Sequence, residues 1–270
     1  MTERMVERDG VRLAVEQAGP QDGAPIVLLH GLTATRRYVV MGSKTLERGG
    51  FRVIAYDARG HGSSGPASAY TYAHLAGDLL AVMDACGVER AVLAGASMGA
   101  HTLLRVALDA PERVAGVVAI TPAFDPSVPP NLERWDALAQ GLRDGGIEGF
   151  VAAYGVEDEV PEAWVDTVRT VLRQRMAQHA DLSAVADALQ QVPRSQPFAS
   201  LDELRAIAVP TVVVADRDEA DPGHPLAVGE AYAAALPGAR LVVEEPDRSP
   251  IAWQGGQLSR VIAELAAEAG

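Results

Sequence analysis

The feature that most constrains the fold of this chain is a repeated alternation between short apolar runs and helical patterns. Six runs are rich in β-branched residues and apolar throughout, at 25–30, 52–57, 90–96, 114–121, 210–216 and 239–245. Runs of this kind are typical of strands that are covered on both faces of a parallel sheet. Helical patterns lie between them, at roughly 35–48, 72–86, 98–110, 225–236 and 254–268. The alternation predicts the α/β class, with a mostly parallel, doubly wound sheet.

One interval interrupts the alternation. Residues 124–208 contain helical stretches and no strand pattern. Because an insertion of this size between two strands is too long for a plain loop, we expect a helical lid that excludes water from a site beneath it. The alternative is a helical decoration that only adds stability. The predicted organisation is therefore a core of residues 1–123 and 209–270 with an inserted helical lid at 124–208.

Charge and composition exclude several classes of protein. The chain has 23 Lys and Arg against 36 Asp and Glu, a net charge of −13, which argues against nucleic acid and anionic membranes as partners. The single cysteine, Cys86, and a charged N-terminus without an apolar stretch lead us to expect a cytoplasmic protein. No dinucleotide glycine fingerprint, phosphate-binding loop or cysteine-histidine cluster is present, so we expect neither cofactor nor metal. The oligomeric state is not indicated.

The strongest chemical signal is the segment Gly95-Ala96-Ser97-Met98-Gly99. It closes a predicted strand and opens a predicted helix, which is the context that a G-x-S-x-G nucleophile elbow requires. The glycines permit a tight turn and a close approach of neighbouring backbone. Ser97 would then present its hydroxyl at the helix N-terminus, where it can act as a nucleophile.

Two further segments agree with this interpretation. His30-Gly31 follows a strand directly, so the backbone N–H of Leu32 can join that of Met98 as an oxyanion hole. The segment "YDARGHGSSG" at 56–65 follows the next strand. The order HG, D-x-R-G-H-G-x-S and G-x-S-x-G resembles the α/β-hydrolase superfamily, and most of all its lidded esterases, lactonases and proline iminopeptidase relatives. The resemblance covers nearly the whole chain but leaves the substrate open, because this fold hosts many reactions.

The resemblance implies that the acid of a catalytic triad lies just past the strand that follows the lid. Asp218 in "VVVADRDEADPGHP" matches this position best. Two neighbouring aspartates are given structural roles: Asp216 terminates the strand and Asp221 caps the following turn. Asp125, after the strand that ends at Thr121, is the substitute acid found at that place in some relatives.

The histidine that the resemblance implies after the last strand is missing. The segment "EPDRSP" at 245–250 places Arg248 there. An arginine stays protonated and has no acceptor atom, so it cannot take a proton from Ser97. Three answers are open. Another histidine serves as base; or Arg248 has a role of its own, in an ion pair with Asp218 or as a clamp for a substrate carboxylate; or the site is catalytically impaired and binds a ligand.

Position separates the candidate histidines. We expect His30 and His61 to hold loops, His101 to pack in the core, His74 to lie on a remote helix, and His179 to lie on the solvated face of the lid. His224 lies in the loop that carries Asp218, at the carboxyl ends of the strands, where sites form in such sheets. It is either the displaced base or a solvent-facing residue at the start of a helix.

The sequence thus predicts a hydrolase acting on a small ester, lactone or related acyl substrate. Ser97 would form an acyl-enzyme, stabilised by the amides of Leu32 and Met98, with Asp218 as acid and His224 as proton carrier. The alternative is a catalytically impaired protein of the same fold that binds a small molecule under its lid.

Overall fold

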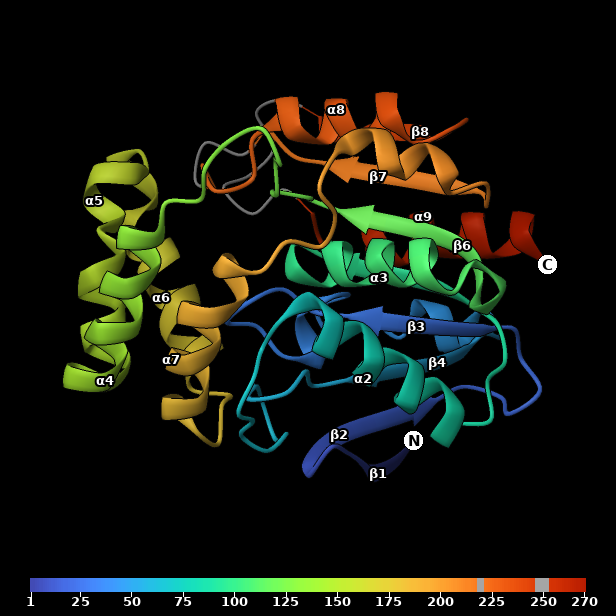
Figure 1. The fold of residues 1–270 in the computed structure, drawn as a ribbon, viewed down its shortest axis with the longest axis horizontal. Coiled ribbons are helices and arrows are strands. Elements are labelled where there is room, and N and C mark those ends of the chain that lie inside the picture. The colour runs from blue at the N-terminus through green and yellow to red at the C-terminus, as the bar shows by residue number, and fades with distance from the viewer. Residues whose placement is uncertain (218–220, 246–252) are drawn as a thin grey trace.

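The computed structural model describes residues 1–217, 221–245 and 253–270. Its centre is an eight-stranded sheet in the order β1-β2-β4-β3-β5-β6-β7-β8 (Figure 1). The strands are β1 Thr2–Arg8, β2 Val11–Ala18, β3 Pro25–Leu29, β4 Arg52–Tyr56, β5 Ala91–Ala96, β6 Val114–Ile120, β7 Thr211–Ala215 and β8 Arg240–Val243. Pairs β1–β2 and β2–β4 are antiparallel, and the remaining pairs are parallel. The predicted mostly parallel sheet is confirmed.

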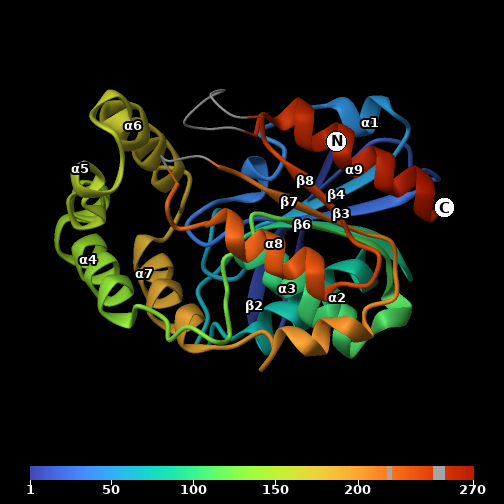
Figure 2. The same cartoon turned by 90° about the horizontal axis from the view of Figure 1, so that it is seen from above.

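Helices cover both faces of the sheet, as the uniformly apolar strands require. One face packs against α2 Tyr72–Ala85, α3 Met98–Asp109 and α8 Leu226–Ala235, and the other against α1 Thr45–Arg48 and α9 Gly255–Ala269 (Figure 2). Alternate residues of a strand therefore enter different cores: Val27 and Leu29 of β3 face α2 and α3, whereas Ile26 and Leu28 face α9. Within the described residues, no helix has the length and apolarity needed to cross a membrane.

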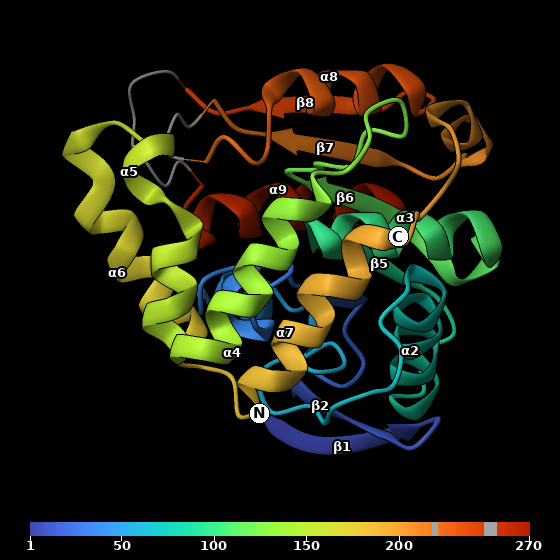
Figure 3. The same cartoon turned by 60° about the vertical axis from the view of Figure 1, so that its left-hand side comes forward.

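A helical insertion, residues 124–208, separates β6 from β7. It contains α4 Leu132–Tyr154, α5 Val156–Glu159, α6 Val165–Met176 and α7 Leu182–Gln191. These helices share an apolar core of their own that includes Leu142, Phe150, Met176 and Leu189. They stand at the end of the sheet to which β6 and β7 point, so the insertion lies over the carboxyl ends of the strands (Figures 1 and 3).

The predicted helix at 35–48 is wrong. This segment forms a short 3-10 turn at Arg36–Tyr38 and the four-residue helix α1. Between them Met41 and Gly42 have φ values of +47° and +73°, which no right-handed helix accommodates. The apolar spacing that favoured a helix instead directs Val39, Val40 and Leu46 into the core beneath α9.

Candidate active site

Three neighbouring strands end in strained backbone. Thr33 follows β3 with φ +67°, Ser97 follows β5 with φ +50°, and Thr121 follows β6 with φ +42°. Residues other than glycine rarely adopt positive φ, and such strain concentrates at functional sites. The carboxyl edge of an open α/β sheet is also where ligands bind. Local strain and topology therefore indicate the same edge of the sheet.

Ser97 occupies the sharp turn between β5 and α3. Its backbone angles are φ +50° and ψ −113°, and its N–H donates to the Ile120 carbonyl of β6 at 2.9 Å. The flanking glycines are needed by space: a Cβ on Gly99 would lie 2.3 Å from the Leu29 carbonyl oxygen, and one on Gly95 would lie 2.5 Å from the Gly99 carbonyl carbon. The strand–turn–helix geometry that the G-x-S-x-G pattern predicts is present.

The loop after β3 lies beside this turn. A Cβ built on Gly31 would lie 3.4 Å from the Ser97 Cβ. Leu32 and Met98 pack in one apolar cluster, which also contains Ala188 of the insertion. Neither the Leu32 N–H nor the Met98 N–H donates a hydrogen bond to a described residue. Two backbone donors without acceptors among the described residues are thus held near the serine turn, as an oxyanion hole requires.

His224 lies beside a carboxylate, but a different one from that predicted. Its Nδ1 is 2.8 Å from Asp221 Oδ2, a charged contact in which the carboxylate oxygen is out of line with the ring N–H. Burial, the largest influence on His224, lowers its pKa, yet the charge of Asp221, helped by Asp216, raises the pKa overall. The His224 charge also lowers the pKa of His101, one turn after Ser97 on α3. The loop that carries His224 follows β7, and β6 alone separates β7 from β5 in the sheet, so His224 lies at the carboxyl edge that carries Ser97.

The pairing of Asp221 with His224 was missed because Asp221 was assigned only to the local turn. Its backbone carbonyl does accept the His224 N–H at 3.2 Å, which fits that turn role. Burial is the largest influence on the Asp221 carboxyl and raises its pKa, but the charges of His224 and Arg175 make the net shift of the pKa downward. The spacing Asp-x-x-His is the signal from which the contact could have been found.

Other predicted residues are not brought together. Within the described residues, Ser97 Oγ makes no hydrogen bond to any histidine. Asp218 and Arg248 lie outside the described residues, so their assignments stay predictions. Asp125 is engaged locally, since its Oδ1 accepts from the amide and the hydroxyl of Ser127 at 2.8 and 2.6 Å.

Three histidines form a buried group next to the site. The ring centroids of His30 and His61 are 5.2 Å apart, and those of His61 and His179 are 5.6 Å apart. His30 Nε2 accepts the Ala58 N–H at 2.9 Å, and His61 Nδ1 donates to the Arg59 carbonyl at 2.9 Å. The predicted loop-holding roles of His30 and His61 agree with these bonds. The described residues offer no group of three or more His, Cys, Asp or Glu suited to a metal ion.

The expectation for His179 is wrong. This residue is 8% exposed rather than solvated. Its Nδ1 accepts the Gly62 N–H at 2.8 Å and its Nε2 donates to the Thr33 carbonyl at 3.0 Å. Burial, the main cause, lowers the pKa of His179 to about 4. His179 therefore fastens the end of α6, as a neutral ring, to the loops after β3 and β4.

His101 packs in the core as predicted, whereas the first turn of α2, which carries His74, is not remote from the site, since its Tyr72 packs in one cluster with Met98. His101 is buried beneath the site, where its Nε2 accepts the backbone N–H groups of Ala123 and Phe124 at 3.1 Å each and its Nδ1 donates to the Tyr72 hydroxyl at 3.0 Å. It holds the junction between β6 and the insertion. His74 lies in the first turn of α2, with Nδ1 2.7 Å from the Thr71 hydroxyl.

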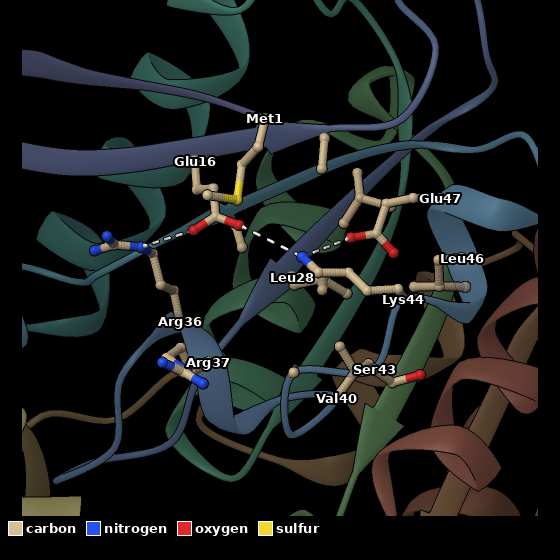
Figure 4. Close-up of a pocket in the computed structure, with 14 residues that line it drawn as sticks. Met1, Glu16, Leu28, Arg36, Arg37, Val40, Ser43, Lys44, Leu46 and Glu47 are labelled. Atoms are coloured by element: carbon tan, nitrogen blue, oxygen red, sulfur yellow. Dashed lines mark hydrogen bonds and ion pairs between the residues drawn. The ribbon is translucent and has the colours of Figure 1, made fainter.

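A cavity of about 290 Å³ lies elsewhere, between α1 and the strands β2 and β4 (Figure 4). Most of its charged groups already pair with one another: Lys44 contacts Glu47 at 3.3 Å and Glu16 at 4.0 Å, and Arg36 contacts Glu16 at 3.8 Å. Neither Ser97 nor His224 lines it. We therefore place the candidate active site at the strained strand ends and not in this cavity.

Comparisons with known proteins agree with this geometry. Residues 24–254 match the model of the alpha/beta hydrolase fold family. The chain is 26% identical over 231 residues to 3-oxoadipate enol-lactonase 1 of Acinetobacter baylyi (84% of this chain, 82% of the relative). A thermophilic esterase of Thermogutta terrifontis superposes with a TM-score of 0.80 at 27% identity (100% of this chain, 99% of the esterase). Est816, described as an N-acyl homoserine lactone degrading enzyme, superposes with a TM-score of 0.73 at 28% identity (98% and 99%). These relatives are hydrolases of ester and lactone type, and the chain belongs to the α/β-hydrolase fold family.

Proposed function

We propose that this protein hydrolyses a small ester, lactone or related acyl substrate through an acyl-enzyme on Ser97. The observation that carries the proposal is the strained Ser97 turn beside two backbone N–H groups, those of Leu32 and Met98, that have no acceptor in the part of the chain that the structure describes. Attack by a hydroxyl turns a carbonyl oxygen into an oxyanion, and donors fixed in advance stabilise that charge without reorganisation. The ester and lactone chemistry named for the relatives supports this substrate class.

His224 is the proposed proton carrier. It would accept the proton of Ser97 Oγ during attack and return it to the leaving alcohol; a water molecule would then cleave the acyl-enzyme by the same route. Asp221 supports this role, because its carboxylate 2.8 Å from Nδ1 favours the protonated ring that forms during attack. In this proposal Asp221 takes the place predicted for Asp218, and His224 closes on Ser97 when substrate is bound.

One observation favours a second candidate function. Ser97 Oγ has no hydrogen bond to a described histidine, and a serine without a base is a poor nucleophile. A protein in that condition would bind a small molecule beneath the helical insertion and turn it over slowly. Residual catalysis from an oxyanion hole alone amounts to ~10³- to 10⁴-fold over water, so a weak esterase signal does not separate the two candidates.

Covalent labelling separates them. We would measure the rate at which a fluorophosphonate modifies the wild type, with intact mass as the readout. We expect rapid single labelling that disappears in Ser97→Ala and falls ~10²-fold or more in His224→Asn, because general-base catalysis is worth that much. His74→Asn is the matched control and should label like the wild type, because among the described residues the His74 ring bonds only the neighbouring Thr71 hydroxyl at the start of α2.

The pH dependence of labelling adds a test of the base. Because Asp221 raises the pKa of His224, removing its charge in Asp221→Asn should move the acidic limb of the labelling profile to lower pH. Slow labelling of the wild type, equal to that of His224→Asn at every pH, would refute the hydrolase proposal and favour the binding protein.

A further inference from the structure

Arg175 differs from the other arginines of the helical insertion. All six others pair with a carboxylate of the insertion: Arg134 with Glu159, Arg143 with Asp187, Arg169 with Glu157, Arg173 with Glu148, Arg194 with Asp136 and Arg205 with Asp202. The guanidinium of Arg175, in the last turn of α6, makes no hydrogen bond or ion pair with a described residue, and its Nε is buried without a partner. A buried donor without an acceptor costs free energy unless something else supplies the acceptor.

The charge of Arg175 acts across the boundary between the insertion and the sheet. On the insertion side it opposes the burial that raises the pKa of Tyr154, and it adds to the burial that lowers the pKa of His179. Burial is the largest influence on Asp221 and His224 in the loop after β7; there the Arg175 charge helps to lower the pKa of Asp221 and opposes the net rise in the pKa of His224. No described carboxylate lies within 4 Å of the guanidinium. The charge of the guanidinium therefore reaches the residues around the proposed proton carrier, and no described carboxylate neutralises it.

We propose that Arg175 binds a carboxylate carried by the substrate. The preferred substrates are then half-esters of dicarboxylic acids, or lactones that carry a free carboxylate group. This inference rests on the proposed function of the same site. A guanidinium offers two parallel N–H donors that match the two oxygens of a carboxylate. A singly charged group suits the position better than a phosphate dianion, because the Asp221 carboxylate, on which the Arg175 charge acts, repels a second negative charge.

Paired substrates test this inference. We would compare kcat/KM for the mono-4-nitrophenyl esters of succinate, glutarate and adipate with that for neutral 4-nitrophenyl pentanoate, after subtracting spontaneous hydrolysis. Arg175→Gln should lower kcat/KM for the best half-ester ~10-fold or more, because a charge-assisted bidentate contact is lost. Hydrolysis of the pentanoate should change less than about twofold. Equal losses on the charged and the neutral ester would overturn the inference and leave the hydrolase proposal standing.

Arg173→Gln is the matched control. It lies one half-turn earlier on α6, and its guanidinium is half exposed and bonded to Glu148 at 2.7 and 2.8 Å. Since exposed pairs contribute little, this variant should process both esters within about twofold of the wild type. A loss of half-ester preference in Arg173→Gln equal to that in Arg175→Gln would mean that the general charge of α6 is responsible, and would also overturn the inference.

Binding keeps the inference testable if the wild type hydrolyses neither ester. Calorimetric titration with glutarate would then compare the wild type with Arg175→Gln. A dissociation constant at least ~10-fold weaker in the variant would support the carboxylate site on a protein that is not a hydrolase. Absent binding, or equal binding by both proteins, would overturn it.

Discussion

Acid should destabilise this protein through its buried neutral histidines, and His179 offers the sharpest test. Burial lowers the pKa of His179 to about 4 and that of His101 to about 3 in the folded protein. Unfolding returns each to about 6.5. Both rings are at most 8% exposed, so little of the shift is lost to solvent screening.

The magnitude follows from proton linkage. The folded pKa is below the unfolded one, so each histidine leaves stability intact above about pH 6.5 and removes it as the pH falls toward the folded value. At pH 5 the unfolded state has bound a proton that the folded state still excludes. For His179 the cost at pH 5 is about 2 kcal/mol, against a few tenths at pH 7. His101 adds about as much, because its folded value is lower still.

Urea unfolding at pH 7 and at pH 5 measures this cost. In His179→Gln we expect a loss of about 1–2 kcal/mol at pH 7, because the bonds to Gly62 and Thr33 are disturbed. The fall in unfolding free energy between pH 7 and pH 5 should nevertheless be about 2 kcal/mol smaller than in the wild type, because no proton is taken up at this position. Gln178→Ala, at the exposed neighbouring residue, should keep the full pH dependence. An undiminished pH dependence in His179→Gln would refute the reasoning.

Two further predictions concern the frame around the site. Asp78→Asn should lower the free energy of unfolding by about 3–5 kcal/mol in urea titrations, because it weakens two bonds of 2.7 Å and leaves the buried guanidinium of Arg59 uncompensated. The exposed Asp84→Asn, the control, should cost less than about 1 kcal/mol. Similar losses in the two variants would contradict this prediction. Gly99→Ala should lower the free energy of unfolding by at least about 1–3 kcal/mol and slow the labelling of Ser97, since its Cβ would lie 2.3 Å from a backbone atom. Gly145→Ala, with open space around the new Cβ, should not destabilise the protein. Labelling of Gly99→Ala at the wild-type rate would show that the turn tolerates a side chain.

The sheet and the serine turn were predictable because their causes are local. An apolar β-branched run such as 114–121 must be covered on both faces, and this alone fixes it as a buried parallel strand. The glycines around Ser97 likewise indicate that neighbouring backbone comes too close at these positions for any side chain to fit. The helix predicted at 35–48 was wrong for the converse reason. Its apolar spacing is typical of a helix, but the positive φ of Met41 and Gly42 depends on the surrounding fold and not on the local sequence.

Side chains whose partners lie far along the chain were not predictable. His179 is polar and close to a helix end, which favours solvent, and only the docking of the insertion places it against Gly62, 117 residues earlier. The ion pair of Arg59 with Asp78 is hidden in the same way, since Asp78 lies within a helix whose apolar spacing does not reveal which polar position faces inward. The ion pair of Arg248 with Asp218 stays a prediction, because both residues lie outside the described part of the chain.

The acid sensitivity and the proposed carboxylate preference have one structural origin, the end of α6. Arg175 and His179 are four residues apart and joined by the backbone bonds Gln178 N–H to Arg175 carbonyl at 3.2 Å and His179 N–H to Met176 carbonyl at 3.3 Å. The ring of His179 is bonded to the loops after β3 and β4, so it sets where the preceding helical turn lies against the sheet. In the proposed function, Arg175, which has no carboxylate partner among the described residues, can select a substrate only if its position relative to Ser97 is fixed. The buried neutral ring of His179 fixes that position and lowers the stability of the protein in acid. The docking contact that sequence reasoning missed is thus the one on which the proposed selectivity depends.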